Sequence, residues 1–280
     1  MEQTWTTIIS PKKKIIDFNL REVLEYRDLI YLFVKRNFSI QYKQTILGPL
    51  WFIINPLLTT FIYTVVFGNI AGFDTEGAPQ FVFYLCSTAL WQYFASCLTT
   101  TSNTFTANAA IFGKVYFPRL TVVIASVIYG LVNFFVIFCV SVVAIIVYML
   151  NGANISIGIH IILVPVLLFQ TALLGLGVGT IISSLTTKYK DLSVLVGFGV
   201  QLWMYATPVV YPITQLPDKM KQISMYNPMS PIMNNFRYAM MGSGTLEVKY
   251  WIISVINTVI VSMIGIILFN RVEKTFMDTV

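Results

Sequence analysis

The most chemically distinctive residues of this chain are aromatic or uncharged polar side chains within long apolar runs. Flat ring faces can stack against sugar units, and we predict a path through the protein lined by Trp51, Trp91, Tyr93, Trp203 and Tyr205. The alternative for any single ring is an interfacial belt at the ends of membrane spans. Uncharged hydrogen-bonding groups occur in the same runs at Asn55, Gln92, Gln170 and Gln201, where they either face the path or hold helices together.

Charged side chains are absent from these runs, which limits the chemistry that the chain can perform. None of the runs contains Asp, Glu, Lys, Arg or His, whereas proton-coupled transporters and voltage sensors usually carry such a group within the bilayer. The sequence also has no GxxxxGK(S/T) phosphate loop. We therefore expect no catalytic residue and no cofactor in this chain, and any ATP and Mg²⁺ to be bound by a separate subunit.

The glycine, histidine and cysteine patterns have structural explanations. Gly175 and Gly179 lie four residues apart in an apolar run, which favours close helix packing over a nucleotide loop. His160 is the only histidine and has no Cys, Asp or Glu near it in sequence, so we expect an interfacial role and no metal site. The cysteines have no paired short spacing, and we expect small core residues at Cys86, Cys97 and Cys139.

The elements that must position these side chains are membrane helices. Hydrophobic residues make up 56% of the 280 residues and charged residues 11%, compared with roughly 25% charged in a soluble domain. A helix needs about 20 apolar residues to cross a bilayer. Six runs meet this length, and we predict an all-α membrane protein with spans at about residues 50–70, 81–101, 120–150, 161–187, 192–211 and 251–270.

The basic residues predict the orientation of these spans. Lys and Arg are retained on the cytoplasmic side during insertion, and 14 of the 18 basic residues lie in segments 1–49, 102–119, 186–191 and 271–280. Both termini are therefore expected in the cytoplasm. The net charge of +6 is no sign of a nucleic-acid partner, because eight basic residues precede the first span, where insertion and anionic headgroups explain them.

Three segments outside the spans are also informative. Residues 1–20 predict a loosely ordered cytoplasmic arm. Residues 21–45 predict an amphipathic interface helix, lying on headgroups or on a partner protein, because three- and four-residue steps separate Tyr26, Ile30, Phe33, Val34 and Phe38. Residues 103–119 contain a moderately apolar stretch that ends at Pro118, which predicts a short helix at the cytoplasmic surface.

The segment from residue 212 to residue 249 is far longer than the usual connection of about 4–6 residues. Ser230 as a cap, Pro231 at the first helical position and Gly242 as a stop predict one short helix. Residues 216–225 predict a second short helix. We expect these two partly apolar helices to dip into the outer leaflet and to form a lid or gate.

Several strings resemble membrane subunits of ABC type-2 exporters for polysaccharides, in that family's order. The start of the family's first span is similar to residues 35–45 (KRNFSIQYKQT), 47–51 (LGPLW) and 55–56 (NP), although Asn37 and Ser39 stand where more charge would be expected. Segments near its ATPase contact are similar to residues 114–119 (KVYFPR) and 188–192 (KYKDL). Its outer region and tail are similar to residues 207–212 (TPVVYP), 226–231 (YNPMSP) and 271–278 (RVEKTFMD).

The resemblance implies an ABC type-2 transmembrane domain over residues 46–280, with two copies of this chain and two of a separate ATPase in the inner membrane of a bacterium. It implies a lipid-linked glycan as substrate: O antigen, teichoic acid or capsular polysaccharide. On this basis, contact with the ATPase and coupling to it are expected at Phe105, Ala109, Ile111, Phe112, Tyr116, Lys188 and Asp191. The outer gate is expected at Met225, Tyr226, Pro228, Pro231, Phe236, Arg237 and Met241.

Three alternative functions stay open at the level of sequence. A type-2 permease for a drug or a small lipid would have a closed apolar pocket, whereas a polysaccharide exporter needs a continuous aromatic channel. A membrane glycosyltransferase would need acidic residues for a metal and a sugar nucleotide, and the outer acids are only Asp74, Glu76, Asp218 and Glu247. A passive channel or scaffold would have no ATPase partner.

Overall fold

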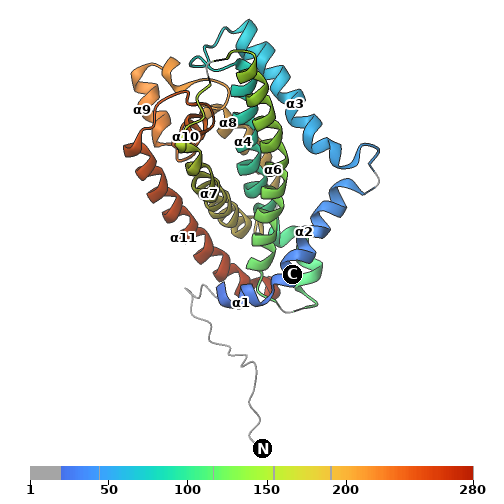
Figure 1. Cartoon of the computed structure of the whole chain (residues 1–280). Helices are drawn as coiled ribbons and strands as arrows, with labels where there is room; N and C mark the ends of the chain where they lie inside the picture. Colours follow the sequence, from blue (N-terminus) through green and yellow to red (C-terminus); the bar gives the residue numbers. More distant parts are fainter. Residues whose placement is uncertain (1–19, 44, 116, 154, 190, 280) are drawn as a thin grey trace, which may run out of the picture.

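The computed structural model describes residues 20–279 apart from 44, 116, 154 and 190, and every regular element in this part of the chain is helical (Figure 1). Tyr116 and nearly all of the arm over residues 1–20 lie outside the described residues. The α-helices are α1 (Leu20–Glu25), α2 (Arg27–Tyr42), α3 (Trp51–Tyr63), α4 (Gln80–Ser102), α5 (Thr104–Phe112), α6 (Leu120–Leu150), α7 (Leu163–Thr186), α8 (Leu192–Ala206), α9 (Asp218–Tyr226), α10 (Met229–Met241) and α11 (Val248–Thr279).

Five of the predicted spans are confirmed as long apolar helices. Candidate membrane spans in the described chain cover Gly48–Ile70, Gln80–Ser102, Leu120–Leu150, Ile159–Thr186 and Val248–Glu273, within three residues of the predicted bounds. The first combines a 3-10 turn (Gly48–Leu50), α3 and a π-helical segment (Thr64–Ile70), and the fourth begins with a 3-10 turn (Ile159–Ile162). The protein is therefore a multi-pass membrane protein.

The remaining predicted span, residues 192–211, is only partly helical. Helix α8 ends at Ala206 after 15 residues, which corresponds to about 22 Å and is shorter than the roughly 30 Å apolar core of a bilayer. Pro208 and Pro212 prevent its continuation, and residues 207–210 form an irregular segment that is buried inside the protein. Irregular backbone at membrane depth requires such burial.

Helix α4 is the centre of the bundle, between α6 on one side and α7 on the other. In its apolar window 78% of the residues are buried, compared with 11% in the window containing α3. The approach of α7 depends on glycine, because a Cβ added at Gly179 would lie 2.6 Å from the Cβ of Thr101, and one at Gly175 2.8 Å from that of Cys97. The predicted role of Gly175 and Gly179 in close helix packing is confirmed.

Helix α11 packs on the other face of α7. A Cβ added at Gly177 would lie 2.8 Å from the backbone of Ser262. Gln170 also joins the two helices, since its Nε2 donates to Ser254 Oγ at 2.8 Å and its Oε1 accepts from Trp251 Nε1 at 2.9 Å. Of the two roles considered for Gln170, the structure shows the one that holds helices together.

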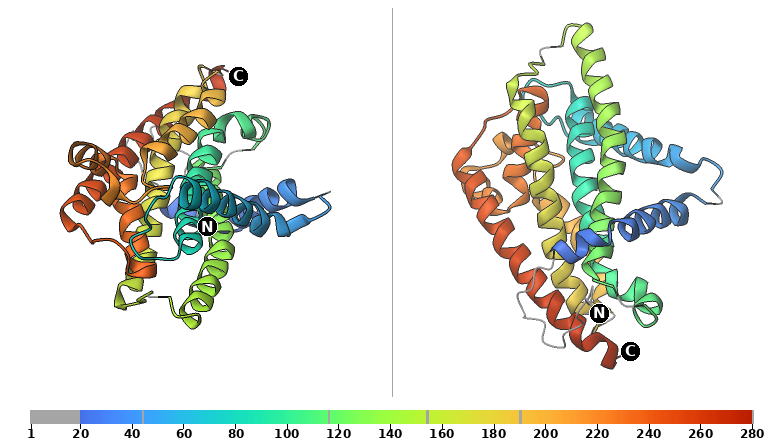
Figure 2. Two further views of the ribbon diagram at one scale, coloured as in Figure 1. Left: turned by 90° about the horizontal axis from the view of Figure 1, so that it is seen from above. Right: turned by 60° about the horizontal axis from the view of Figure 1, so that its bottom comes forward.

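A second core lies at the lower end of the bundle in Figure 1, where α1, α2, α5 and the last turns of α11 meet the start of α6. It contains Val23, Ile30 and Phe33 from the amphipathic segment, so that segment packs on its own chain rather than only on headgroups or a partner. The opposite face of the segment exposes Leu24, Tyr31, Leu32 and Ile40. Helices α2 and α3 then project together from the side of the bundle (Figure 2).

The two short helices predicted after α8 are present as α9 and α10, at the upper end in Figure 1. Helix α10 begins at Met229, two residues before the expected first helical residue Pro231, with Pro228 as its N-cap. It ends at Met241, and the C-cap Gly242 has a left-handed φ of +72°. All of its residues except Tyr238 are buried by the surrounding helices. Helix α10 is therefore enclosed by protein.

The close contact between α4 and α7 leads to a stability prediction. Gly179→Ala should lower the free energy of unfolding by about 1–3 kcal/mol, because the new methyl group meets Thr101 and the Leu98 carbonyl, 2.9 Å away, which cannot both move aside. Gly158→Ala is the control, since an added Cβ at this exposed glycine makes only an ordinary contact of 3.6 Å with the ring of His160. Thermal unfolding of the purified variants in detergent measures the difference, and equal midpoints would contradict the predicted contact.

Candidate functional site: a polar cleft beside α4

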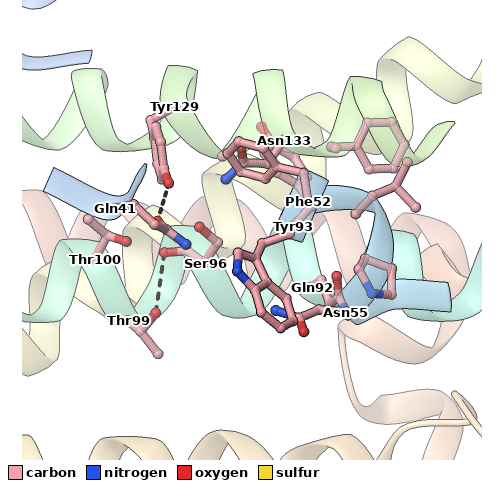
Figure 3. A pocket seen from close by; sticks show the side chains of 15 residues that line it. Gln41, Phe52, Asn55, Gln92, Tyr93, Ser96, Thr99, Thr100, Tyr129 and Asn133 are labelled. Carbon is pink, nitrogen blue, oxygen red and sulfur yellow. Dashed lines mark hydrogen bonds between the residues drawn. The ribbon is translucent and has the colours of Figure 1, made fainter. Parts of the chain in front are cut away.

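A cavity of about 370 Å³ lies between α3, α4 and α6, and α2 closes one side of it (Figure 3). Its walls combine rings with amides and hydroxyls and include no charged side chain. The lining residues are Gln41, Trp51, Phe52, Asn55, Pro56, Gln92, Tyr93, Ser96, Thr99, Thr100, Tyr129, Gly130, Asn133, Phe134 and Ile137. We refer to this cavity as the polar cleft.

Helix α4 supplies a polar stripe to the cleft. Gln92, Ser96, Thr99 and Thr100 line it and recur at steps of about one helical turn, which places them on one side of the helix. The Thr99 hydroxyl also donates to the Ala95 carbonyl at 2.7 Å, a bond that satisfies a polar group inside an apolar bundle. The opposite face of α4 carries the residues packed against α7, so one helix both anchors the bundle and lines the cleft.

Helix α6 forms the facing wall. Its Tyr129 hydroxyl donates to Gln41 Oε1 of α2, which fixes the side of the cleft nearest that helix (Figure 3). One turn further along α6, the amide oxygen of Asn133 is buried and accepts no hydrogen bond from the described residues. Gly130 lies between them, and a Cβ there would be 3.4 Å from the ring of Tyr93. The α6 wall of the cleft thus contains a buried acceptor without a hydrogen-bond partner among the described residues.

The structure places the five rings that were predicted to line a path in three different environments. Trp51 and Tyr93 line the polar cleft. Trp91 and Trp203 both contact Phe94, with centroids 5.3 and 5.1 Å apart, in the core between α4 and α8. Trp203 also donates from Nε1 to Asn227 Oδ1 at 2.9 Å, which fixes the start of α10 to α8. Tyr205 is half exposed on the outer surface of α8.

The residues expected at an ATPase contact lie at the lower end of the bundle but differ in exposure. Phe105 and Phe112 are buried beneath α2 and α11, so in this structure they support α5 and do not form its surface. Arg119 stacks over both rings and donates to the Glu273 carbonyl at 2.6 Å. The surface is formed by partly buried and exposed residues of α5 and of the turn between α7 and α8, among them Ala109, Ile111, Lys188 and Asp191.

The residues expected at the outer gate are mostly interior. The Arg237 side chain is 1% exposed, lies 4.4 Å from the centroid of the Phe83 ring and donates to the Pro208 carbonyl. It therefore connects α10 to the irregular segment after α8. Met225, Pro231, Phe236 and Met241 are buried, Pro228 is partly buried and accepts a hydrogen bond from Ser254, and Tyr226 is exposed.

Sequence reasoning missed much of the polar cleft. It identified Asn55 and Gln92 as uncharged groups, but not the stripe of Ser96, Thr99 and Thr100 or the facing Tyr129 and Asn133. A signal was present, because hydroxyl and amide residues from Gln92 to Asn103 recur with a helical period inside an apolar run. Gln41 gave no such signal, since only tertiary packing brings α2 to this cavity.

Comparison with known proteins identifies relatives over most of the chain. The sequence profile of the family described as "ABC-2 type transporter" matches residues 28–241. The chain is 30% identical over 252 residues to an O-antigen export system permease protein RfbA of Klebsiella pneumoniae, covering 90% of this chain and 94% of that protein. It is 25% identical over 221 residues to the protein of the same name from Myxococcus xanthus, covering 78% and 82%.

These matches agree with the architecture, since the profile begins at the start of α2 and ends at the end of α10. The multi-pass helical bundle is the membrane part of a transporter, and the polar cleft lies within it. The chain belongs to the ABC-2 type transporter family and is a permease subunit of such a transporter.

Proposed function

We propose that this chain is the channel-forming permease of an exporter driven by ATP hydrolysis that moves lipid-linked polysaccharide across the bacterial cytoplasmic membrane. The observation that carries the proposal is the polar cleft, whose walls combine rings, amides and hydroxyls and contain no charged group. Sugars present hydroxyl groups and flat ring faces, and both are bound well by such a lining.

The relatives support the same substrate class. Proteins named for O-antigen export align with nearly the whole chain, and we extend that substrate class to this protein, with teichoic acid and capsular polysaccharide as members of the same chemical group. The polar character of the cleft favours this assignment over a drug or a small lipid, for which a closed apolar pocket is expected.

The exposed face of α8 supports a contact with a second copy of the chain. This helix buries only Val196, Val200 and Met204 within the chain. Gly197 and Gly199 are exposed with no atom within 4 Å of an added Cβ, and small residues allow another helix to approach closely. A helix too short to cross the bilayer is also better covered by protein than by lipid, and we propose a homodimer through this face.

The family implies an ATPase partner, which would bind ATP and Mg²⁺. We propose two copies of it at the lower end of the bundle, which the basic residues predict to be cytoplasmic. The exposed side of α5 and the nearby Lys188 and Asp191 form the coupling surface in this proposal. Phe105 and Phe112 transmit movement from this surface, because they connect α5 to α11 through the second core at the lower end of the bundle.

The polar cleft can be tested with the double variant Gln92→Leu and Asn133→Leu, which removes hydrogen-bonding groups at similar volume. Polysaccharide at the cell surface should fall at least about fivefold, since one hydrogen bond contributes about 1 kcal/mol. Asn151→Leu, at the exposed end of the same α6, should leave export unchanged. Normal export by the double variant, at normal membrane levels, would refute the role of the cleft.

The dimer can be tested by cysteine cross-linking on α8. In a Cys139→Ser background, which removes the only exposed cysteine of the described chain, cysteines are introduced at Val194, Leu195, Phe198 and Leu202, all exposed. At least one should yield a covalent dimer in membranes. Cysteines at Val143 and Val147, on the exposed face of α6, should not. Cross-linking confined to α6 would place the interface elsewhere.

The coupling surface can be tested with Ala110→Glu, which adds a charge to the exposed side of α5. Co-purification of the ATPase should fall about tenfold or more, because a charge buried without a partner at an interface is strongly unfavourable. Ala71→Glu adds the same charge at an exposed site between α3 and α4 and should retain the ATPase. Equal retention by both variants would exclude this part of α5 from the contact.

A further inference from the structure

A second cavity, of about 300 Å³, lies directly below the polar cleft. The two cavities share Thr99 and Thr100, so they form successive parts of one groove along α4. The lower cavity is lined by Arg36, Asn37, Thr99, Thr100, Asn103, Ala107, Asn108, Val122 and Ser126. Its lining differs from that of the upper cavity, since it includes one cation, no acid and no aromatic ring.

The guanidinium of Arg36 is held in place from two sides. Its Nη2 donates to Asn108 Oδ1 at 2.6 Å, and the Asn108 amide is itself oriented by a 2.9 Å bond from Nδ2 to the Thr104 carbonyl. The ring of Phe33 lies 4.9 Å from the guanidinium carbon. Arg36 is thus preorganised, whereas the neighbouring Lys35 is exposed.

Arg36 retains free binding capacity in the described chain. Only one of its three nitrogens has a hydrogen-bond partner, Nε is buried without one, and no carboxylate pairs with the guanidinium. Partial burial lowers the pKa of Arg36 from its ordinary value, but arginine stays charged in proteins. The amide of Asn37 and the hydroxyl of Thr100 line the same cavity and make no side-chain hydrogen bond with described residues, so they add neutral donors.

We infer that the lower cavity is a binding site for a phosphate group carried on a lipid, with Arg36 as its cationic ligand and Asn37 and Thr100 as further donors. Arginine presents several donors in a planar fork that matches phosphate oxygens. An oriented, partly buried guanidinium without a carboxylate partner is suited to binding an anion, whereas the charge of the exposed Lys35 is solvated by water.

The position of the site gives the inference a functional meaning, which rests on the proposed function. A glycan joined to its lipid through a phosphate ester or a diphosphate would place that group beside Arg36 and its first sugars in the polar cleft above. The charge at the lower end and the rings and amides above it match the two chemical parts of such a molecule. The phosphate of a bilayer phospholipid offers the same chemistry, and the experiment separates the two sources.

The test measures lipid binding to the purified full-length chain in detergent, by titration and native mass spectrometry. The probes are undecaprenyl diphosphate, undecaprenol, which lacks the phosphates, and phosphatidylglycerol. The variants are Arg36→Gln, which can still donate to Asn108, and Lys35→Gln as the matched control for charge. Thermal unfolding of each variant confirms that it is folded.

Arg36→Gln should weaken the binding of undecaprenyl diphosphate about 10- to 100-fold, the range for losing charge-assisted hydrogen bonds. Lys35→Gln should bind it normally, and undecaprenol should bind weakly to every form. Arg36-dependent binding of phosphatidylglycerol at equal affinity would support the phosphate site with a bilayer lipid as its occupant. Equal binding by wild type and Arg36→Gln, or equal binding of undecaprenol and the diphosphate, would overturn the inference.

The export assay in cells and the binding assay on purified protein together separate this inference from the proposed function. Loss of surface polysaccharide in the polar-cleft double variant, together with unchanged diphosphate binding by Arg36→Gln, would overturn the phosphate site alone. Normal export by the double variant, together with Arg36-dependent binding, would overturn the role of the cleft in export and support the phosphate site.

Discussion

The rest of the structure depends on the close approach of α4 and α7. Three faces of α4 are in use, because α7 lies against one, α6 against another and the polar cleft opens along the third. That arrangement needs glycines in α7 at the positions where a side chain would collide with Cys97 and Thr101. A larger separation would shift the polar stripe of α4 relative to Tyr129 and Asn133 of α6, and the cleft would lose its facing walls.

Hydropathy and charge were sufficient to predict most of the helices, because lipid requires long apolar runs and leaves few alternatives. The exception, α8, shows the limit of that reasoning. The run over residues 192–211 is as apolar as a true span, yet its last residues leave the helix at Thr207 and are buried against α10. A hydropathy window cannot distinguish lipid from protein as the apolar surrounding, so it overestimated this helix. The same ambiguity explains α10, which is enclosed by protein.

Side-chain roles were harder to predict than helices, and the reasons are visible at particular residues. Trp91 and Trp203 are chemically equivalent to Trp51, but Phe94 packs between the first two and makes them core residues. Phe105 and Phe112 have the apolar surface expected of a contact residue, and α2 and α11 cover it. Lys35 and Arg36 are adjacent cations, and of the two only Arg36 is oriented by a hydrogen bond to Asn108 of α5. In each case the decisive neighbour is distant in sequence.

The absence of charge from the walls of the polar cleft affects how a long polymer would move along it. Neutral hydrogen bonds exchange readily with water and contribute little individually, so a repeating glycan would meet a nearly level energy profile in which each register resembles the next. The polymer would not be trapped in any one register, and glycans of different composition would experience similar friction. Such a lining would not discriminate between polymers of different length. Selection of the length and of the terminal unit would then depend on other parts of the transporter.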